Sequence, residues 1–258
     1  MNLALNTDGR RPPAPSFHWR SVEALLLAAF AAFTTWVGAR SYYSIPVEAR
    51  PFRAIYGTSL SSQYDEEIFI RDFFDGKRHG FFVDVGANDY RKYNNTYYLE
   101  NVLGWSGIAI DAVGEFARGY AAHRPRTQLF NFFVSDTSDE RARFWVAAGD
   151  HLLSSSEHDV AGAGSTARTV PTITLNDLLA RAGIQTVDFV SMEIELAEPK
   201  ALAGFDIRRY RPALVCIEAH LHVRQHILNY FAENNYVIVG RYLRADTRNL
   251  YFAPLTAR

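Results

Sequence analysis

Polar residues end four consecutive apolar runs of this 258-residue chain. Asp84-Val-Gly-Ala-Asn88 ends the first run, Asp111 the second, Ser135-Asp136 the third and Glu193 the fourth. In open α/β sheets, ligands bind beyond the carboxyl ends of the strands, where the strand order reverses. Each position alone has a structural explanation, because Asp, Asn and Ser are common turn and cap residues. Four such endings in succession favour a binding site.

The glycine pattern and the charge of these residues indicate the kind of ligand. Gly86 and Ala87 let the backbone approach a bound group, and Asp111 can accept hydrogen bonds from a ribose diol. A dinucleotide site would need the pattern G-x-G-x-x-G to admit a pyrophosphate. This chain instead has one glycine followed by Asn88-Asp89-Tyr90, and acidic residues repel phosphate. A cationic nucleoside without phosphate, such as S-adenosylmethionine, fits better, which favours a methyltransferase over a dehydrogenase.

Candidate catalytic residues follow the fourth and fifth apolar runs. Methyl transfer needs an acceptor oxygen in line with the sulfonium carbon, and a base can remove the hydroxyl proton. We predict Glu193, Glu195 and His220 as catalytic residues. Glu198 is a further candidate, although a carboxylate beside Pro199 also stabilises a helix N-terminus. No metal is predicted, because these carboxylates and His220 could hold one but their spacing is not diagnostic.

The pattern of apolar runs predicts a doubly wound α/β fold around these residues. Strands are expected at 81–86, 107–111, 129–134, 188–194 and 213–218, with 236–240 and 249–252 closing the series. Helices are expected over 115–123, from Pro199 and over 223–233. Because both faces of the inner strands are apolar, helices should cover both sides of the sheet. His151 and Ser154-Ser-Ser156 fall in a long segment without a regular pattern, either a lid over the acceptor or a disordered loop.

The composition is that of an ordinary globular protein, with 48% hydrophobic and 21% charged residues. A formal net charge of −1 gives no electrostatic reason to expect a nucleic-acid partner. Cys216 is the single cysteine, which excludes an internal disulfide and a multi-thiolate metal site. Its apolar surroundings in the sequence predict a buried structural thiol.

The first 61 residues divide into three segments by composition. Residues 1–20 are polar and proline-containing, which predicts disorder. Residues 24–39 carry no charge, and the longer segment 21–39 approaches the roughly 20 residues that a membrane-spanning helix needs. We predict a single-pass anchor there, with a cleaved signal peptide ending at Ala39 and a peripheral or buried helix as alternatives. Residues 40–61 predict a linker, and residues 62–258 the catalytic domain.

Seven sequence blocks between Ser61 and Pro254 occur in an order typical of one known family. They are 62–63, 80–88 (GFFVDVGAN), 95–100 (NTYYLE), 104–110 (GWSGIAI), 170–179 (VPTITLNDLL), 188–195 (DFVSMEIE) and 198–206 (EPKALAGFD). In these blocks the chain resembles the FkbM methyltransferases. The resemblance implies a seven-stranded methyltransferase sheet with a reversed final hairpin, S-adenosylmethionine as cofactor and transfer to a hydroxyl oxygen.

The resemblance also implies a role for each strand-ending residue. Carried over by position, Asp84, Gly86 and Asn88 lie at the methionine end of the cofactor, Asp111 at the ribose and Ser135-Asp136 beside the adenine. Glu193 takes the acidic position near the transferred methyl group.

The expected function is therefore that of an S-adenosylmethionine-dependent O-methyltransferase acting on a lipid, a glycan or another small acceptor. Tyr90 and Leu196 stand where the resembling family commonly has glycine, and their bulk beside the pocket points to an alternative. That alternative is a catalytically inactive binding module of methyltransferase fold at a membrane. S-adenosylmethionine is a cytosolic metabolite, so we expect the catalytic domain on the cytosolic side.

Overall fold

A computed structural model of the chain describes residues 47–148 and 154–255. The predictions for the polar segment 1–20, for the anchor 21–39 and for His151 lie outside the described residues. So does the first part of the predicted linker, residues 40–46.

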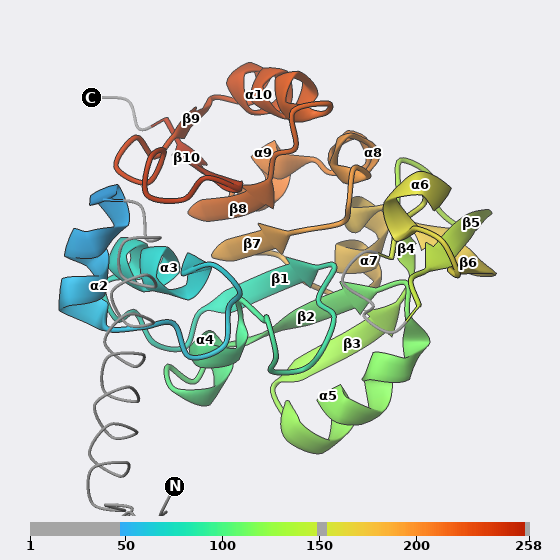
Figure 1. Cartoon of the computed structure of the whole chain (residues 1–258), viewed down its shortest axis with the longest axis horizontal. Helices are drawn as coiled ribbons and strands as arrows, with labels where there is room; N and C mark the ends of the chain where they lie inside the picture. Colours follow the sequence, from blue (N-terminus) through green and yellow to red (C-terminus); the bar gives the residue numbers. More distant parts are fainter. Residues whose placement is uncertain (1–46, 149–153, 256–258) are drawn as a thin grey trace, which may run out of the picture. The chain divides into compact units, whose positions relative to one another are not determined.

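Within the described residues, a seven-stranded mixed sheet forms the centre of the domain (Figure 1). Its strand order is β3-β2-β1-β7-β8-β10-β9, and β10 alone runs antiparallel to its neighbours β8 and β9. The predicted α/β fold and its reversed final hairpin are confirmed. The order reverses between β1 and β7, which pair directly. The strands are β1 (Phe81–Val85), β2 (Ser106–Asp111), β3 (Thr127–Asn131), β7 (Phe189–Met192), β8 (Leu214–Glu218), β9 (Tyr236–Ile238) and β10 (Asn249–Pro254).

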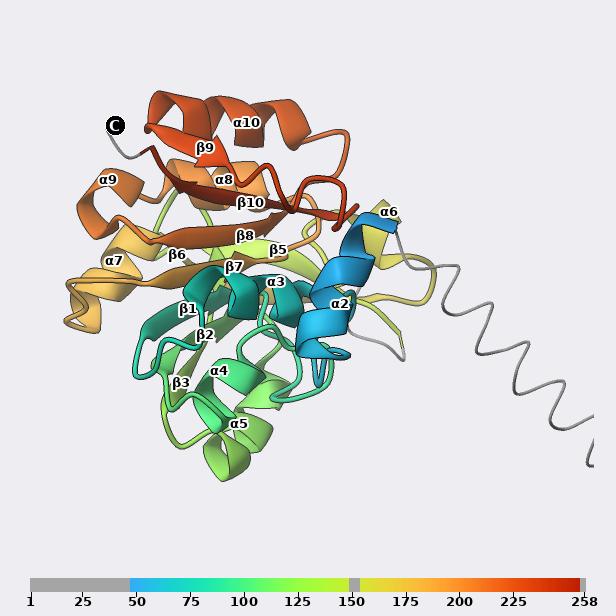
Figure 2. The same cartoon turned by 90° about the vertical axis from the view of Figure 1, so that its left-hand side faces the viewer.

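Helices cover both faces of the sheet because alternate strand residues are apolar on each face (Figures 1 and 2). Val83, Val190 and Val215 pack into one core with four helices, namely α7 (Leu175–Arg181), α8 (Glu198–Ala203), α9 (Ile207–Tyr210) and α10 (Arg224–Glu233). Phe82 and Phe189 point to the opposite face. That face carries α3 (Glu66–Phe74), α4 (Tyr97–Asn101) and α5 (Ala117–His123), the last preceded by the 3-10 turn η2 (Gly114–Phe116).

The strand predicted at 129–134 divides into two strands that belong to different sheets. β3 ends at Asn131, whose side chain donates to the carbonyl of Asp111, its partner at the end of β2 (2.8 Å). β4 (Phe133–Val134) then pairs with β6 (Thr166–Ile173) in a three-stranded sheet of order β4-β6-β5. β5 (Arg141–Val146) and β6 form an antiparallel pair in the segment expected to be irregular, and α6 (His158–Ala161) lies between them in sequence.

Residues 47–56 precede the expected domain start and are helical. They form η1 (Val47–Ala49) and α2 (Arg50–Tyr56), which both fall within the predicted linker, residues 40–61. The Arg53 guanidinium pairs with Asp65 at 2.7 Å, and the Phe52 ring packs edge-on against Phe69 of α3. These contacts attach α2 to the catalytic domain.

The predicted single-pass membrane location is corrected here. A helix needs about 20 residues to cross the hydrocarbon core, whereas α10, with 10 residues, is the longest helix of the described part. Among the described residues, no helix has the length and apolar character of a membrane span.

Candidate functional site

A cavity lies at the carboxyl ends of β1, β2 and β7, at the point where the strand order reverses. The space between its lining atoms, including open solvent at its mouth, is about 510 Å³. Three carboxylates, those of Asp111, Glu193 and Glu195, line it. The remaining lining residues are Val85, Gly86, Asn88, Ile110, Ala112, Phe132, Phe133, Val134, Phe144, Ser154 and Ile194. Residues that end three of the four apolar runs, namely Asn88, Asp111 and Glu193, therefore converge, because parallel strands bring their carboxyl ends to one edge.

Gly86 is required by the close approach of two strand ends. Its φ is +82°, and a Cβ added there would lie 1.9 Å from the carbonyl oxygen of Glu193. The sequence suggested that this glycine makes room for a ligand, but the backbone of β7 already fills that space. Asn88 also has a positive φ, +49°, which an asparagine tolerates better than most residues.

We expect Gly86→Ala to lower the free energy of unfolding by about 2–3 kcal/mol, since it adds left-handed strain and overpacks the β1–β7 junction. Urea unfolding measures the change. Gly57→Ala is the matched control, because Gly57 also has a positive φ (+78°) but has no atom within 4 Å of an added Cβ. Equal losses in the two variants would contradict the role of the β1–β7 contact.

Asp111 ends β2 and is held in place by backbone donors. Its Oδ2 accepts from the Asn88 N–H (2.9 Å) and its Oδ1 from the Val113 N–H (2.7 Å). Burial raises the pKa of Asp111 to about 6, against the lowering effect of these two hydrogen bonds. A carboxylate has about four lone-pair positions, so Asp111 can still accept from two ligand hydroxyls.

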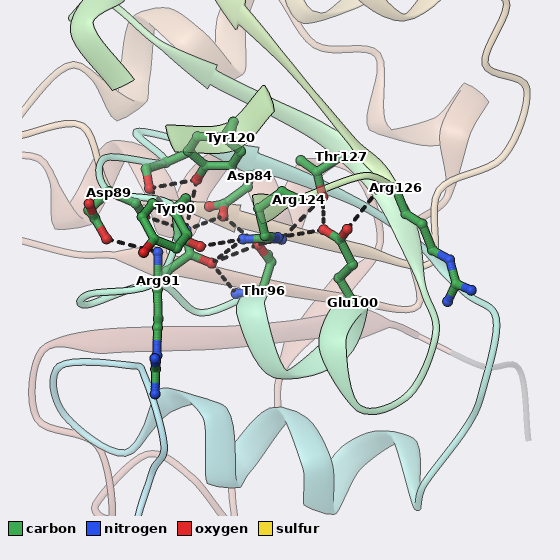
Figure 3. A network of polar contacts seen from close by, with 12 residues as sticks. Asp84, Asp89, Tyr90, Arg91, Thr96, Glu100, Tyr120, Arg124, Arg126 and Thr127 are labelled. Carbon is green, nitrogen blue, oxygen red and sulfur yellow. Dashed lines mark hydrogen bonds and ion pairs between the residues drawn. The ribbon is translucent and has the colours of Figure 1, made fainter. Parts of the chain in front are cut away.

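Asp84 lies in a buried polar network and does not line the cavity (Figure 3). Ala87 does not line the cavity either and joins the network through its carbonyl. The Asp84 carboxylate accepts from Thr96 Oγ1 (2.8 Å), and the Ala87 carbonyl accepts from Asn94 Nδ2 (3.0 Å). Burial raises the pKa of Asp84 to about 6. Arg124 lies at the centre of the network. In this structure Asp84 and Ala87 hold the loop after β1, and Asn88 of that loop lines the cavity.

Glu193 follows β7 and lines the cavity together with Gly86. Its Oε1 accepts from the Asn95 amide (2.8 Å), which also donates to Ser191 (3.1 Å). Burial, together with the charge of Glu66, raises the pKa of Glu193 well above its usual range. Asn95 thus orients Glu193, the carboxylate that the FkbM resemblance implies near the transferred methyl group.

Glu195 and His220 come together at the next strand end. His220 Nε2 lies 3.1 Å from Glu218 Oε1 and 3.7 Å from Glu195 Oε2. Burial, and then the charge of Glu218, raise the pKa of Glu195 to about 7. Glu198 is the first residue of α8, the helix N-terminal position that was the alternative to a catalytic role. Its Oε1 accepts from the Ile194 N–H (3.0 Å). Glu195 lines the cavity, and the carboxylates of Glu218 and Glu198 lie within electrostatic reach of it.

Residues 84–238, more than half of the chain, match the family described as the methyltransferase FkbM domain. The chain belongs to this family. The resemblance found in the sequence is thereby confirmed. No curated protein matches the chain.

Solved structures of methyltransferases resemble the chain at low identity. An O-methyltransferase from Bacillus cereus in complex with SAH is 12% identical, with a TM-score of 0.43 over 80% of this chain and 87% of that one. A TehB-like SAM-dependent methyltransferase from Corynebacterium glutamicum is 12% identical, with a TM-score of 0.42 over 84% and 98%. The Burkholderia thailandensis 1,6-didemethyltoxoflavin-N1-methyltransferase is 14% identical, with a TM-score of 0.33 over 96% of each chain.

Two residues carried over from the FkbM resemblance lie elsewhere in this structure. Ser135 is buried, with its N–H donating to Ile173 at the end of β6 (3.0 Å) and its Oγ to Asp136 (2.9 Å). Neither residue lines the cavity. The wall at that end is apolar instead, made by Phe132, Phe133 and Phe144. Sequence reasoning missed this wall because Phe144 arrives on β5, in the segment without a clear pattern.

The two positions where glycine is common in FkbM proteins do not crowd the cavity. Tyr90 stacks on His123 of α5, with ring centroids 4.5 Å apart. Leu196 has a φ of +75°, a backbone conformation that glycine adopts without strain. Neither side chain is among the cavity-lining groups. The positive φ at position 196 therefore explains why FkbM proteins commonly have glycine there.

Proposed function

We propose that this chain is an S-adenosylmethionine-dependent methyltransferase that transfers the methyl group to a hydroxyl oxygen of a lipid, a glycan or another small acceptor. The observation that carries the proposal is the cavity at the β1–β7 switch point, where Asp111, Glu193 and Glu195 meet an apolar wall. Membership of the FkbM family supports methyl transfer and S-adenosylmethionine as the cofactor.

The charge of the cavity fits this cofactor. Among the described residues that line it, three are carboxylates and none is a lysine, arginine or histidine. Such a cavity repels phosphate and attracts the sulfonium and ammonium charges of S-adenosylmethionine. Asp111 would accept from the ribose, and Phe133 and Phe144 would pack against the adenine, because an aromatic wall suits a planar base.

Bound S-adenosylmethionine supplies an electrophilic methyl carbon. Glu193, oriented by Asn95, would accept the proton of the acceptor hydroxyl, with Glu195 and His220 as further proton acceptors at the same border. Ser154, which enters the cavity from the segment before α6, would help to exclude water there. The binding-module alternative rested on crowding by Tyr90 and Leu196, and neither residue reaches the cavity.

Cofactor binding tests the proposal directly. We expect S-adenosylhomocysteine to bind the full chain in a calorimetric titration. Asp111→Asn should weaken binding by about 1–3 kcal/mol, or roughly 5- to 150-fold in Kd, because a ribose hydroxyl loses a charged acceptor. Burial raises the pKa of Asp111 to about 6, so its ionised form is lost as the pH falls through that value. Affinity should therefore be full above about pH 7 and fall below pH 6.

Two variants, Asp84→Asn and Asp111→Asn, distinguish the effect of Asp111 ionisation on binding from that of Asp84. Burial also raises the pKa of Asp84 to about 6, and this residue holds the loop after β1. The loss of affinity around pH 6 should persist in Asp84→Asn and be much smaller in Asp111→Asn, where Glu195, with its pKa of about 7, is left as a titrating group of the cavity. No binding at millimolar S-adenosylhomocysteine, with the protein folded, would refute the proposed function.

A further inference from the structure

Three side chains with metal-binding atoms converge where β7 and β8 end. Glu218 is the last residue of β8, His220 follows it by two positions, and Glu195 follows β7. One carboxylate oxygen from each glutamate and one ring nitrogen of His220 all lie within 4.8 Å of one another. Glu195 also lines the cavity, so the cluster lies at the border of the proposed acceptor site.

The spacing of these atoms is close to that of ligands around one divalent ion. Two ligand atoms that are each about 2.1 Å from a metal stand about 3.0–3.4 Å apart at angles near 90–110°. Here the imidazole nitrogen lies 3.1 Å from one carboxylate oxygen and 3.7 Å from the other. The Glu218 oxygen already has this spacing, and the Glu195 oxygen, which lies within 4.8 Å of both other atoms, would move closer to them to complete the set.

Two buried polar atoms in this region have no hydrogen-bond partner among the described residues. His220 Nε2 is one of them, because its 3.1 Å contact with Glu218 is not aligned as a hydrogen bond. Glu198 Oε2 is the other, on a side chain that is 0% exposed and lies within electrostatic reach of Glu218. Buried polar atoms are nearly always paired, so these two point to a missing cationic partner.

We propose that Glu195, Glu218 and His220 bind a divalent cation of the Mn²⁺ class, with Glu198 as a buried carboxylate supporting the site. Carboxylates suit Mg²⁺ and Mn²⁺, and an imidazole shifts the preference toward transition metals. The side chains of Glu195, Glu218 and His220 are 20%, 13% and 38% exposed, which leaves room for water or an acceptor oxygen as further ligands.

The role of the ion rests on the proposed function. A metal-bound hydroxyl loses its proton more readily. The acceptor oxygen then forms a bond to the methyl carbon, the electron pair of the carbon–sulfur bond goes to sulfur, and the hydroxyl proton goes to a carboxylate. The products are the methyl ether, S-adenosylhomocysteine and a protonated carboxyl group.

Titration with Mn²⁺ alone, followed by electron paramagnetic resonance, tests the site without cofactor or acceptor. The full chain, first stripped with a chelator, should bind one equivalent. Glu195→Gln and His220→Ala should each weaken binding at least tenfold. Electron spin-echo modulation from an imidazole nitrogen should be present in the unmutated chain and absent in His220→Ala. His222→Ala is the matched control, since His222 is exposed and outside the cluster.

The outcomes separate a metal site from an ion pair. If His220 only pairs with the two glutamates as a cation, Mn²⁺ will not bind at 1 mM, or the variants will bind it as well as the unmutated chain, and the proposal is wrong. His220→Gln replaces His220→Ala if thermal denaturation finds the latter unfolded. Because S-adenosylhomocysteine binding is measured separately on the stripped protein, the metal site and the proposed function can fail independently.

Discussion

Glu193→Gln should reduce methyl transfer by about 10²–10³-fold while changing the affinity for S-adenosylhomocysteine less than about threefold. The substitution preserves shape, and the glutamine oxygen can still accept from the Asn95 amide, as Glu193 does at 2.8 Å. What it removes is a carboxylate that can take a proton. Only interactions stronger in the transition state than in the ground state change the chemical step. The loss should therefore appear in turnover.

The measurement uses radiolabelled S-adenosylmethionine with lipid and glycan extracts as pools of acceptors. Glu233→Gln is the matched control, because Glu233 is exposed at the end of α10. A purely structural Glu193 would instead lower the melting temperature and the cofactor affinity together, with turnover following affinity. That pattern would refute the catalytic assignment.

The residues that the sequence located best are those that end parallel strands. Gly86, Asn88, Asp111 and Glu193 each follow a short apolar run, which is a local signal. The parallel arrangement brings such endings to one edge without any knowledge of the loops. The seven-stranded sheet with its reversed final hairpin came from the family resemblance, since apolar runs alone do not state which strands are neighbours.

The parts that the sequence did not locate depend on long-range pairing. β5 and β6 pair Val146 with Thr166 and Arg141 with Pro171, and their alternation of polar and apolar residues is too irregular to predict strands. Their pairing carries Phe144 to the cavity wall. Ser135 was expected there because one strand was predicted over 129–134, and the break after Asn131 moves Ser135 toward β6.

Arg124 lies just after α5 and had no role in the sequence predictions. In the structure it is the central hydrogen-bond donor of the polar network in Figure 3. Arg124 is 2% exposed, and its guanidinium donates to Glu100 at 2.5 Å. Further hydrogen bonds go to the Tyr90 carbonyl (2.9 Å), Asn94 (3.2 Å), Thr96 (3.1 Å) and Thr127 (3.1 Å). One side chain thus ties the loop after β1 to the start of α4 and to β3.

We expect Arg124→Met to lower the free energy of unfolding by about 3–5 kcal/mol, because it leaves the buried carboxylate of Glu100 without its cation. For a domain of about 200 residues this corresponds to a fall of about 6–20 °C in Tm. Glu100 would keep the backbone N–H of Arg126 (2.8 Å) and the hydroxyl of Thr127 as donors. Those neutral donors do not replace the charge.

The double variant Arg124→Met with Glu100→Gln distinguishes the ion pair from simple loss of packing. Removing both charges avoids the unpaired buried carboxylate, so the double variant should be more stable than the sum of the two single losses predicts. Strict additivity in urea unfolding would mean that the two groups do not interact and would contradict the network. The loop held by Arg124 carries Asn88 into the cavity. Arg124→Met should therefore also weaken S-adenosylhomocysteine binding under conditions where the variant is still folded, whereas an Arg124 that only fills space would change stability alone.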